Sequence, residues 1–369
     1  MIISSVRTTA FRNLADAVVP TAAKNIFLVG ENGQGKTNFL EALYFCAYAS
    51  SFRGIRDGEI AQNEKKDFSA SITVTGQGNV LIKFENGKKT VFFDDKKVED
   101  RKELLSVIPC IVFCHEDMEF VAGSPERQRW FFDQVLSLYD PVYLDDLRCY
   151  RRVLKSRNSV LRDNVLHRLN GSPEPLLDAL DQQCVLYGIR LMEKRETAAR
   201  LFSGIFAELY REVSGIAGVT VQYLPSWKSF NGEEAAELLR KRRVTDMAAG
   251  NSLSGPHRDR YVFAREGADF RFADFAGTAS TGQRRLLALL LRVAQARRFS
   301  EMTGRNPILL LDDVLLEMDG EKRRRFIDAL PDYDQAFYTF LPEEPFQNYR
   351  REDTLVYHVR DGRMEAEGQ

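Results

Sequence analysis

The sequence has few cysteines and histidines, no excess of charge of either sign and no long apolar run. Its five cysteines are scattered, at Cys46, Cys110, Cys114, Cys149 and Cys184. Only one pair lies close together, without the second pair that completes a zinc site, and the overall composition excludes a disulfide scaffold. We therefore expect buried free thiols in a reducing compartment.

Charge and hydropathy narrow the class further. The 52 basic residues oppose 53 acidic ones, so the formal net charge of −1 favours no particular partner. No stretch approaches the roughly 20 apolar residues that span a bilayer, and the N-terminus lacks a basic segment followed by an apolar one. We expect a soluble, cytoplasmic protein. Because single hydrophobic cores stop growing at roughly 250–300 residues, the 369 residues predict two domains.

The chain combines strand and helix patterns, which predicts an α/β protein. Short apolar or alternating runs predict strands at residues 26–29, 68–75, 80–84, 90–93, 111–113, 219–223, 261–263, 270–272, 307–312 and 354–359. Glycine-rich turns separate the second, third and fourth runs, which is typical of an antiparallel meander. The last run, with a turn at Asp361-Gly362, predicts a closing strand or a hairpin.

The middle of the chain has helical periodicity. Leu147, Leu154 and Leu161 recur every seven residues, which predicts a helix with a packing seam. After a break at residues 170–175, a second helical pattern covers residues 176–213 and predicts a helix on the order of 55 Å long. The two helices form an antiparallel hairpin, for which a structural bundle and an arm that reaches for a partner fit equally well.

A glycine-rich segment, Gly30–Thr37, fits the phosphate-loop pattern G-x-x-x-x-G-K-[ST] between a strand and a helix. Glycines let backbone N–H groups turn inward, so that the loop and the helix N-terminus can hold phosphate oxygens. Lys36 supplies a positive charge for the β- and γ-phosphates, and Thr37 supplies a hydroxyl for Mg²⁺. The predicted nucleotide-binding residues here are Gly30, Glu31, Asn32, Gly33, Gln34, Gly35, Lys36 and Thr37.

Two acids follow the apolar run at residues 307–312. Mg²⁺ prefers hard oxygen ligands, so we expect Asp312 to hold it directly or through water. Asp313 lies one residue further, where a carboxylate can polarise an attacking water. Together with the phosphate loop, these acids predict a nucleotide-hydrolysing site.

The segment Ser280-Thr-Gly-Gln283 opens a leucine-rich helix, predicted over residues 281–298, and resembles the S-G-G-Q signature of ABC-type ATPases. A hydroxyl, an unhindered glycine amide and a helix N-terminus together direct partial positive charge outward. In that family this surface meets the γ-phosphate held by another subunit, which assigns nucleotide contact to Ser280, Gly282 and Gln283. A simple serine N-cap is the alternative.

Several motifs together resemble the RecF family of bacterial recombinational repair proteins, which are ABC/SMC-like ATPases. The matching stretches, in the family's order, are Phe11–Leu14, Gly30–Ala42, Ser51–Arg53, Glu116-Asp117, Gly123–Arg127, Phe132-Asp133, Leu253–Asp259, the signature segment and Pro307–Asp319. The resemblance implies an ABC-type ATPase head, a mixed sheet with an antiparallel meander, at residues 1–120 and 250–369. It implies an inserted helical arm domain at residues 121–249.

The resemblance also implies an activity and partners. A weak, DNA-dependent ATPase would act as a switch, with ATP and Mg²⁺ as cofactors. An ATP-induced homodimer would clamp double-stranded DNA near single-stranded gaps and release it after slow hydrolysis assisted by Asp313. RecO and RecR would be its partners in loading recombinase during DNA repair, replication and the SOS response.

The resemblance leaves two residues with open roles and includes several departures. Thr339 lies where related ATPases place a γ-phosphate sensor, although an ordinary strand threonine fits as well. His257 either caps a turn or acts near the nucleotide or the domain junction. Four positions depart from the family's usual residues: His115, Gln128, Arg260 and Leu316. Because of His115, no residue is assigned the Mg²⁺-water role of a Gln in related ATPases.

Basic residues form three clusters, and DNA affinity comes largely from neutralised phosphates. The clusters are Arg148, Arg151, Arg152, Lys155 and Arg157, then residues 240–243, then residues 322–325. We expect backbone contacts from Arg148, Arg151, Arg152 and Lys155, with solvated helix faces as the alternative. Two other functions stay open: a metabolic P-loop enzyme such as a small-molecule kinase, and a DNA-binding protein whose nucleotide is structural.

Overall fold

The structure is a computed structural model. It describes residues 1–62, 64–100, 102–165, 174–266, 272–315, 318 and 320–368 of the chain. Two compact units divide the chain: Met1–Asp117 with Leu289–Gln369, and Met118–Ala288. A split unit and an inserted unit were expected, but the second boundary falls after Ala288 instead of at residue 250.

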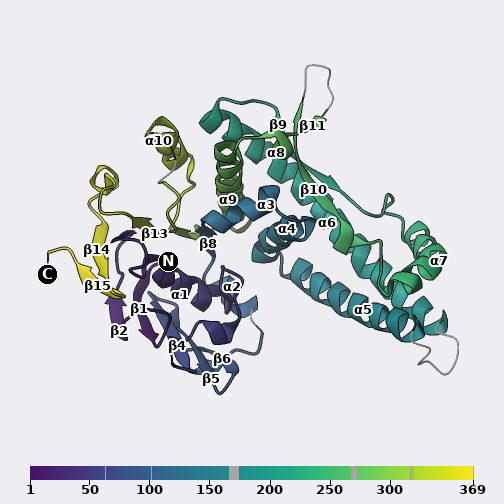
Figure 1. Cartoon of the computed structure of the whole chain (residues 1–369), viewed down its shortest axis with the longest axis horizontal. Coiled ribbons are helices and arrows are strands. Elements are labelled where there is room, and N and C mark those ends of the chain that lie inside the picture. Colours follow the sequence, from purple (N-terminus) through teal and green to yellow (C-terminus); the bar gives the residue numbers. More distant parts are fainter. Residues whose placement is uncertain are drawn as a thin grey trace. The chain divides into compact units, whose positions relative to one another are not determined.

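The first unit contains two sheets and the helices around them (Figure 1). Its elements before the insertion are β1 (Ile3–Thr9), β2 (Ala17–Pro20), β3 (Asn25–Val29), α1 (Lys36–Tyr48), η1 (Asp57–Glu59), β4 (Phe68–Val74), β5 (Gly78–Glu85), β6 (Lys88–Phe93), β7 (Lys96–Lys97), α2 (Lys102–Val107), β8 (Cys110–Phe113) and η2 (His115–Met118). Those after it are β12 (Ile308–Leu311), α10 (Gly320–Ala329), β13 (Gln335–Phe340), η4 (Phe346–Tyr349), β14 (Thr354–Arg360) and β15 (Arg363–Ala366).

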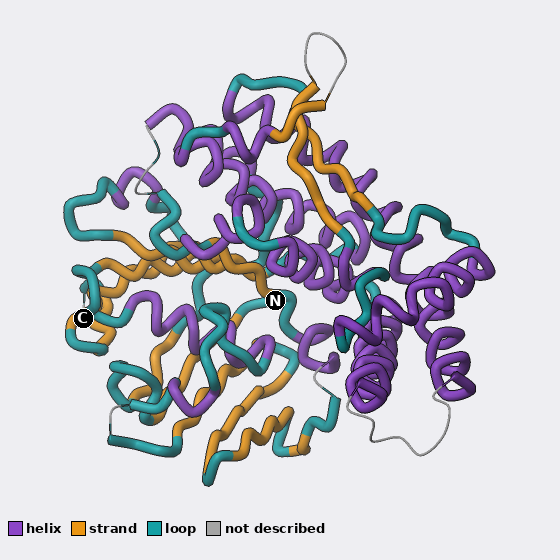
Figure 2. The backbone as a smooth tube through the Cα atoms, turned by 45° about the vertical axis from the view of Figure 1, so that its right-hand side comes forward, coloured by secondary structure: helices purple, strands orange, loops and turns teal. Residues whose placement is uncertain are grey.

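Figure 2 shows the strands of the first unit as orange tubes. Its two sheets differ in strand direction. One sheet has the order β2-β1-β4-β5-β6-β7 and is antiparallel, which confirms the predicted meander. The other has the order β15-β14-β3-β13-β12-β8, and all its neighbours pair in parallel except β14 with β15. Every residue of β3, β12 and β13 is buried, as expected for parallel strands covered on both faces. The closing run forms the hairpin β14–β15.

Helix α1 links the two sheets of the first unit. It packs against β4 and β5 of the antiparallel sheet and against β8 and β13 of the parallel sheet. One hydrophobic cluster therefore continues from the meander through α1 to the parallel strands. This packing fixes the start of α1, which follows the phosphate loop directly.

The second unit is built around two long helices. Its elements are α3 (Glu119–Ala122), α4 (Pro125–Tyr139), α5 (Pro141–Val165), α6 (Glu174–Ser214), β9 (Val219–Leu224), α7 (Gly232–Ala249), η3 (Pro256–Arg258), β10 (Arg260–Glu266), β11 (Phe272–Asp274), α8 (Phe275–Thr278) and the start of α9 (Thr281–Thr303). Helices α5 and α6 pack against each other, as the hairpin prediction required. The 41 residues of α6 span about 60 Å at 1.5 Å per residue. Most of the predicted break at residues 170–175 lies outside the described residues.

Strand pairing explains the shifted boundary. Strand β10 pairs antiparallel with β9, which follows α6 in the chain, and with β11. Because β10 belongs to this sheet, the described residues between 250 and 288 fold with the second unit. Two residues of the predicted strand 270–272 lie outside the described residues.

The described residues show the state of the cysteines and the character of the helices. All five cysteines are free thiols; four are buried, and Cys149 is half-buried. None of the helices in the described ranges has the length and apolar character that crossing a membrane requires.

Candidate functional site

The candidate nucleotide site of the first unit lies where three neighbouring parallel strands end. Strand β13 lies between β3 and β12. The phosphate loop follows β3, Asp312 follows β12, and Thr339 lies near the end of β13. The carboxyl ends of parallel strands share one edge of the sheet, so residues far apart in the sequence meet there.

The phosphate loop has the backbone conformation that its glycines allow. Gly33 has φ of +80° and Gly35 has φ of +118°, both in the left-handed range. Helix α1 begins at Lys36, directly after Gly35. The Lys36 Nζ donates to the carbonyl of Gly30 at 2.6 Å and to that of Glu31 at 3.1 Å, so the ammonium group lies inside the loop. Backbone N–H groups, a helix N-terminus and a lysine thus converge in one cradle for phosphate.

Four polar side chains meet beside this cradle. The Thr37 hydroxyl donates to Asp312 Oδ1 at 2.9 Å. The Thr339 hydroxyl lies 3.2 Å from Asp312 Oδ1 and 3.0 Å from Asp313 Oδ1, and it accepts the backbone N–H of Asp313 at 2.8 Å. Thr339 therefore holds both acids in place. The hydroxyl and carboxylate oxygens of Thr37 and Asp312 are hard ligands, so this donor set fits Mg²⁺.

Electrostatics at this cluster favour a bound cation. Burial and the neighbouring Asp313 carboxylate raise the pKa of Asp312 to about 6. Two carboxylates this close repel each other, and a divalent cation beside Asp312 removes that repulsion. Asp313 has φ of 50°, in the left-handed range that non-glycine residues seldom adopt. This conformation turns the chain sharply after β12.

The turn between β14 and β15 supports the phosphate loop, a contact that sequence reasoning missed. The Gln34 side-chain oxygen accepts the backbone N–H of Asp361 at 2.6 Å, and its carbonyl accepts that of Gly362 at 2.8 Å. A Cβ on Gly362 would lie 1.9 Å from the carbonyl oxygen of Asn13. The Asn13 amide in turn donates to the carbonyl of Gly33 at 2.9 Å. Only glycine allows these segments to approach so closely.

A buried carboxylate gives a structural role to residues 11–14 and 51–53, two stretches of the family resemblance whose role was open. Glu41 of α1 is fully buried and forms an ion pair with Arg12 at 3.0 Å. The Ser51 hydroxyl donates to the same carboxylate, and Arg53 lies 3.5 Å from it. These contacts tie the segments at residues 11–14 and 51–53 to the helix that carries Lys36 and Thr37.

The signature segment lies in the second unit, at the N-terminus of α9. The backbone N–H of Ser280 donates to the Gln283 side chain at 2.8 Å, and the Ser280 hydroxyl accepts the Gln283 N–H at 3.2 Å. This reciprocal pair is a capping box, so the serine is an N-cap. Ser280 and Gly282 are exposed, and a Cβ on Gly282 would meet none of the described atoms within 4 Å. The cap leaves this N-terminus open to solvent.

Other motif residues are structural. Asp117 is buried and pairs with Arg292 at 2.7 Å within the first unit. In the second unit, Arg195 bridges Asp133 at 2.7 Å and Asp259 at 2.8 Å, which joins two of the motifs. Leu316 and Asp319 lie outside the described residues.

His257 has partners on both ring nitrogens. Its Nε2 donates to the Ser252 carbonyl at 2.9 Å, and its Nδ1 lies 2.8 Å from the Tyr150 hydroxyl, which donates to it. Burial lowers the pKa of His257 to about 4, so the ring is neutral at pH 7. The ring fastens η3 to α5 within the second unit.

The basic cluster on α5 divides into two kinds of residue. Arg151, Arg152 and Lys155 are exposed, and Arg148 is half-buried. Arg148 lies 3.9 Å from Asp145, and Arg151 lies 3.2 Å from Asp133. Arg157, the fifth member, is buried, and its guanidinium is paired with Asp181 and Asp246. Counting it among the cations available to DNA was therefore wrong.

The cluster at residues 240–243 contains the same kind of exception. Arg243 is buried and its guanidinium contacts Glu174, Asp178 and Asp181. Charge runs therefore overestimate the cations available to a partner. The exposed residues of α5 remain the candidate DNA contacts.

Comparison with known proteins agrees with this arrangement. The chain matches the RecF/RecN/SMC N terminal domain family over residues 2–364. It is 44% identical over 356 residues to the DNA replication and repair protein RecF of Treponema pallidum, with 95% of this chain and 97% of that protein covered. It is 29% identical over 377 residues to RecF of Trichlorobacter lovleyi, with 100% and 99% covered.

Solved structures share the fold. The recombination mediator protein RecF with ATP, of the RecFOR pathway, has a TM-score of 0.88 and 25% identity, over 99% of this chain and 97% of that chain. An SMC head bound to the C-winged helix domain of ScpA has a TM-score of 0.55 and 14% identity, over 99% and 97%. Fold and site thus define an SMC-like ATPase of the ABC class. The chain belongs to the RecF family of DNA replication and repair proteins.

Proposed function

We propose that this protein is an ATP-controlled DNA clamp of replication and repair. ATP with Mg²⁺ binds at Gly30–Thr37, Asp312 orients the metal, and Asp313 orients the attacking water. The observation that carries the proposal is the cluster in which Thr37 lies 2.9 Å from Asp312 while Thr339 holds Asp313. Bound ATP and Mg²⁺ supply the γ-phosphate that is cleaved and the charge that stabilises its transfer.

Dimerisation is the second part of the proposal. Ser280 and Gly282 are exposed at the N-terminus of α9, where the helix dipole favours contact with an anion, although the cap already uses the N–H groups of Ser280 and Gln283. We assign to them the γ-phosphate held by a second copy of the chain, so that two nucleotides lie between two subunits. The dimer holds double-stranded DNA near a single-stranded gap, slow DNA-dependent hydrolysis releases it, and RecO and RecR act with it in loading recombinase.

Light scattering tests the switch directly. We expect the wild-type chain to become a dimer on addition of ATP and Mg²⁺, and Asp313→Asn to stay dimeric because hydrolysis is slowed. Gly282→Glu adds a carboxylate in open space at a helix N-terminus that tolerates acids, so it should fold, bind ATP and remain a monomer. Gly282→Ala is its neutral control and should dimerise. If ATP leaves every variant monomeric, the nucleotide is structural and the clamp is refuted.

DNA contact requires a separate pair of variants. Arg152 and Lys155 are exposed on α5, so Arg152→Glu with Lys155→Glu changes charge without exposing a buried acid. Each lost phosphate contact lowers the salt slope by about 0.9, so the double variant should bind duplex DNA at least about tenfold more weakly with a slope smaller by about two. Lys65→Glu with Lys66→Glu changes net charge equally in the first unit and should bind as the wild type does. Equal weakening by both pairs would exclude α5 as the contact.

A further inference from the structure

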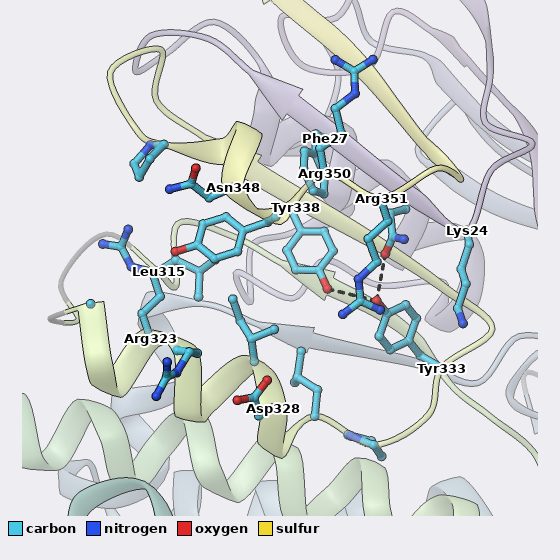
Figure 3. A pocket seen from close by; sticks show the side chains of 18 of the residues that line it. Lys24, Phe27, Leu315, Arg323, Asp328, Tyr333, Tyr338, Asn348, Arg350 and Arg351 are labelled. Carbon is cyan, nitrogen blue, oxygen red and sulfur yellow. Dashed lines mark hydrogen bonds between the residues drawn. The ribbon is translucent and has the colours of Figure 1, made fainter.

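The first unit contains a cavity whose lining residues lie outside the nucleotide cluster. It has a volume of about 810 Å³ and lies against the parallel sheet, between α10 and the segment that contains η4 (Figure 3). Its floor includes Phe27 of β3 and Tyr338 of β13. Their chain neighbours Leu28 and Phe337 belong to the cluster packed around α1. Because successive strand residues point to opposite faces, this cavity lies on the face away from α1.

The floor is aromatic and held in place by ring contacts. The rings of Phe27 and Tyr338 are 5.4 Å apart in an edge-to-face arrangement. The hydroxyls of Tyr333 and Tyr338 lie 3.5 Å apart, and the Tyr333 hydroxyl donates to Asn25 Oδ1 at 2.8 Å (Figure 3). Lys24 Nζ lies 5.3 Å from the centre of the Tyr333 ring. The pocket is therefore preformed, which lowers the ordering cost of binding.

Cations outnumber acids around this floor. The five basic residues that line the pocket are Lys24, Arg323, Arg324, Arg350 and Arg351, against the two acids Asp328 and Asp332. Arg350 is paired with Glu367 at 2.6 Å. Arg323 donates to the Met318 carbonyl at 3.2 Å, and its buried Nε has no hydrogen-bond partner among the described residues. The guanidinium groups leave capacity for an anionic ligand.

We propose that this pocket binds a short acidic segment of a partner protein, with one aromatic or branched aliphatic side chain seated in the pocket. Carboxylates of the segment pair with Arg323, Arg324 and Arg351, because guanidinium binds carboxylate in a bidentate fork. Asp328 and Asp332 accept backbone N–H groups of a peptide, donors that the sugar-phosphate backbone of a nucleic acid lacks. Phe27 and Tyr338 are 1% and 7% exposed, so they form the rigid base of the pocket and offer no open platform on which bases stack. The anchor contacts the half-buried side chains Ile327, Leu330 and Tyr349, which also line the pocket.

Fluorescence anisotropy of the full chain tests the proposal. The probe is a fluorescein-labelled peptide of six alternating aspartates and glutamates ending in Leu-Phe, and a second probe ends in Ala-Ala. We expect the first probe to bind and the second to bind at least about tenfold more weakly, because the anchor is missing. Arg324→Glu with Arg351→Glu should weaken the first probe by at least about tenfold as well.

The control variant makes the same change of charge on the same helix, α10, but outside the pocket. Lys322→Glu with Arg325→Glu changes two other cations of α10 that do not line the cavity, and should bind the peptide as the wild type does. ATP binding by each variant reports folding independently of the peptide. Equal affinity for both peptides, or equal weakening by both pairs of variants, overturns the proposal. So does a single-stranded oligonucleotide that binds this pocket while the peptide does not, which would make it a nucleic-acid site.

Discussion

Replacing Arg157 by leucine should destabilise the second unit strongly, although the residue lies in a run of basic residues. Its side chain is 1% exposed, with Nε donating to Asp181 at 2.7 Å and Nη1 donating to Asp246 at 2.8 Å. Removing one partner of a buried ion pair costs about 3–5 kcal/mol, because the other charge stays buried. Asp246 loses its Arg157 partner inside the protein, but Arg243 still pairs with Asp181 at 2.6 Å, so we expect the lower end, about 3 kcal/mol.

Tryptophan fluorescence during urea unfolding measures this loss selectively. The two tryptophans of the chain, Trp130 and Trp227, both belong to the second unit. With an m-value of about 2 kcal/mol per molar, a loss of about 3 kcal/mol lowers the urea midpoint by about 1.5 M. Arg152→Leu, on the exposed face of the same helix, should change stability by less than about 0.5 kcal/mol. A midpoint for Arg157→Leu within about 0.3 M of the wild type would refute the reasoning.

Three further predictions concern other sites. Gly362→Ala places a Cβ 1.9 Å from the Asn13 carbonyl, so it should weaken ATP binding measured by titration calorimetry, while Gly304→Ala, with open space, should not. The low pKa of His257, about 4 against 6.5 when unfolded, means that the unfolded state binds the proton first. Stability is therefore lost as pH falls through this window, by about 2 kcal/mol at pH 5 in urea unfolding, and His257→Gln should lose less. Arg292→Met leaves Asp117 buried without its counter-charge. It should lower the free energy of unfolding of the first unit by about 3–5 kcal/mol, measured by circular dichroism during unfolding. A change below about 1 kcal/mol would contradict a buried ion pair.

Continuous apolar runs made the parallel strands predictable. Residues 26–29 and 307–312 have no polar face, and the structure places β3 and β12 in the parallel sheet on either side of β13. The acids after β12 and the loop after β3 then had to share an edge. The position of the nucleotide cluster therefore followed from strand patterns and the phosphate-loop spacing, before any contact was known.

The contacts that hold the phosphate loop in place could not be predicted from local sequence patterns. Gln34 meets Asp361 and Gly362 only because β14 pairs with β3, and nothing in the local sequence of either segment specifies that pairing. Propensity and periodicity describe local structure, whereas such a contact depends on the strand order. The same reason explains the misplaced domain boundary, since the pairing of β10 with β9 decides it.

The burial of Arg157, by contrast, had a signal in the sequence. It lies four residues after Val153 and four before Leu161, on the apolar stripe of α5, and both of these residues are buried. A single cation in that stripe predicts a buried ion pair when acids lie on the helices that pack against it. Helical position therefore separates structural from solvent-facing cations better than the density of a charge run does.

This distinction changes the meaning of the net charge of −1. Arg157, Arg195, Arg243 and Arg292 are buried against aspartates, so their charges are largely cancelled inside the protein. Removing such pairs from the count removes cations and anions together, and the exposed surface stays close to neutral. A neutral surface attracts a polyanion only where its cations are concentrated locally. Among the described residues, the exposed cations of α5 form one such concentration. In the proposed clamp, pairing two chains would double the number of these cations near one duplex, and this is how ATP would control DNA binding.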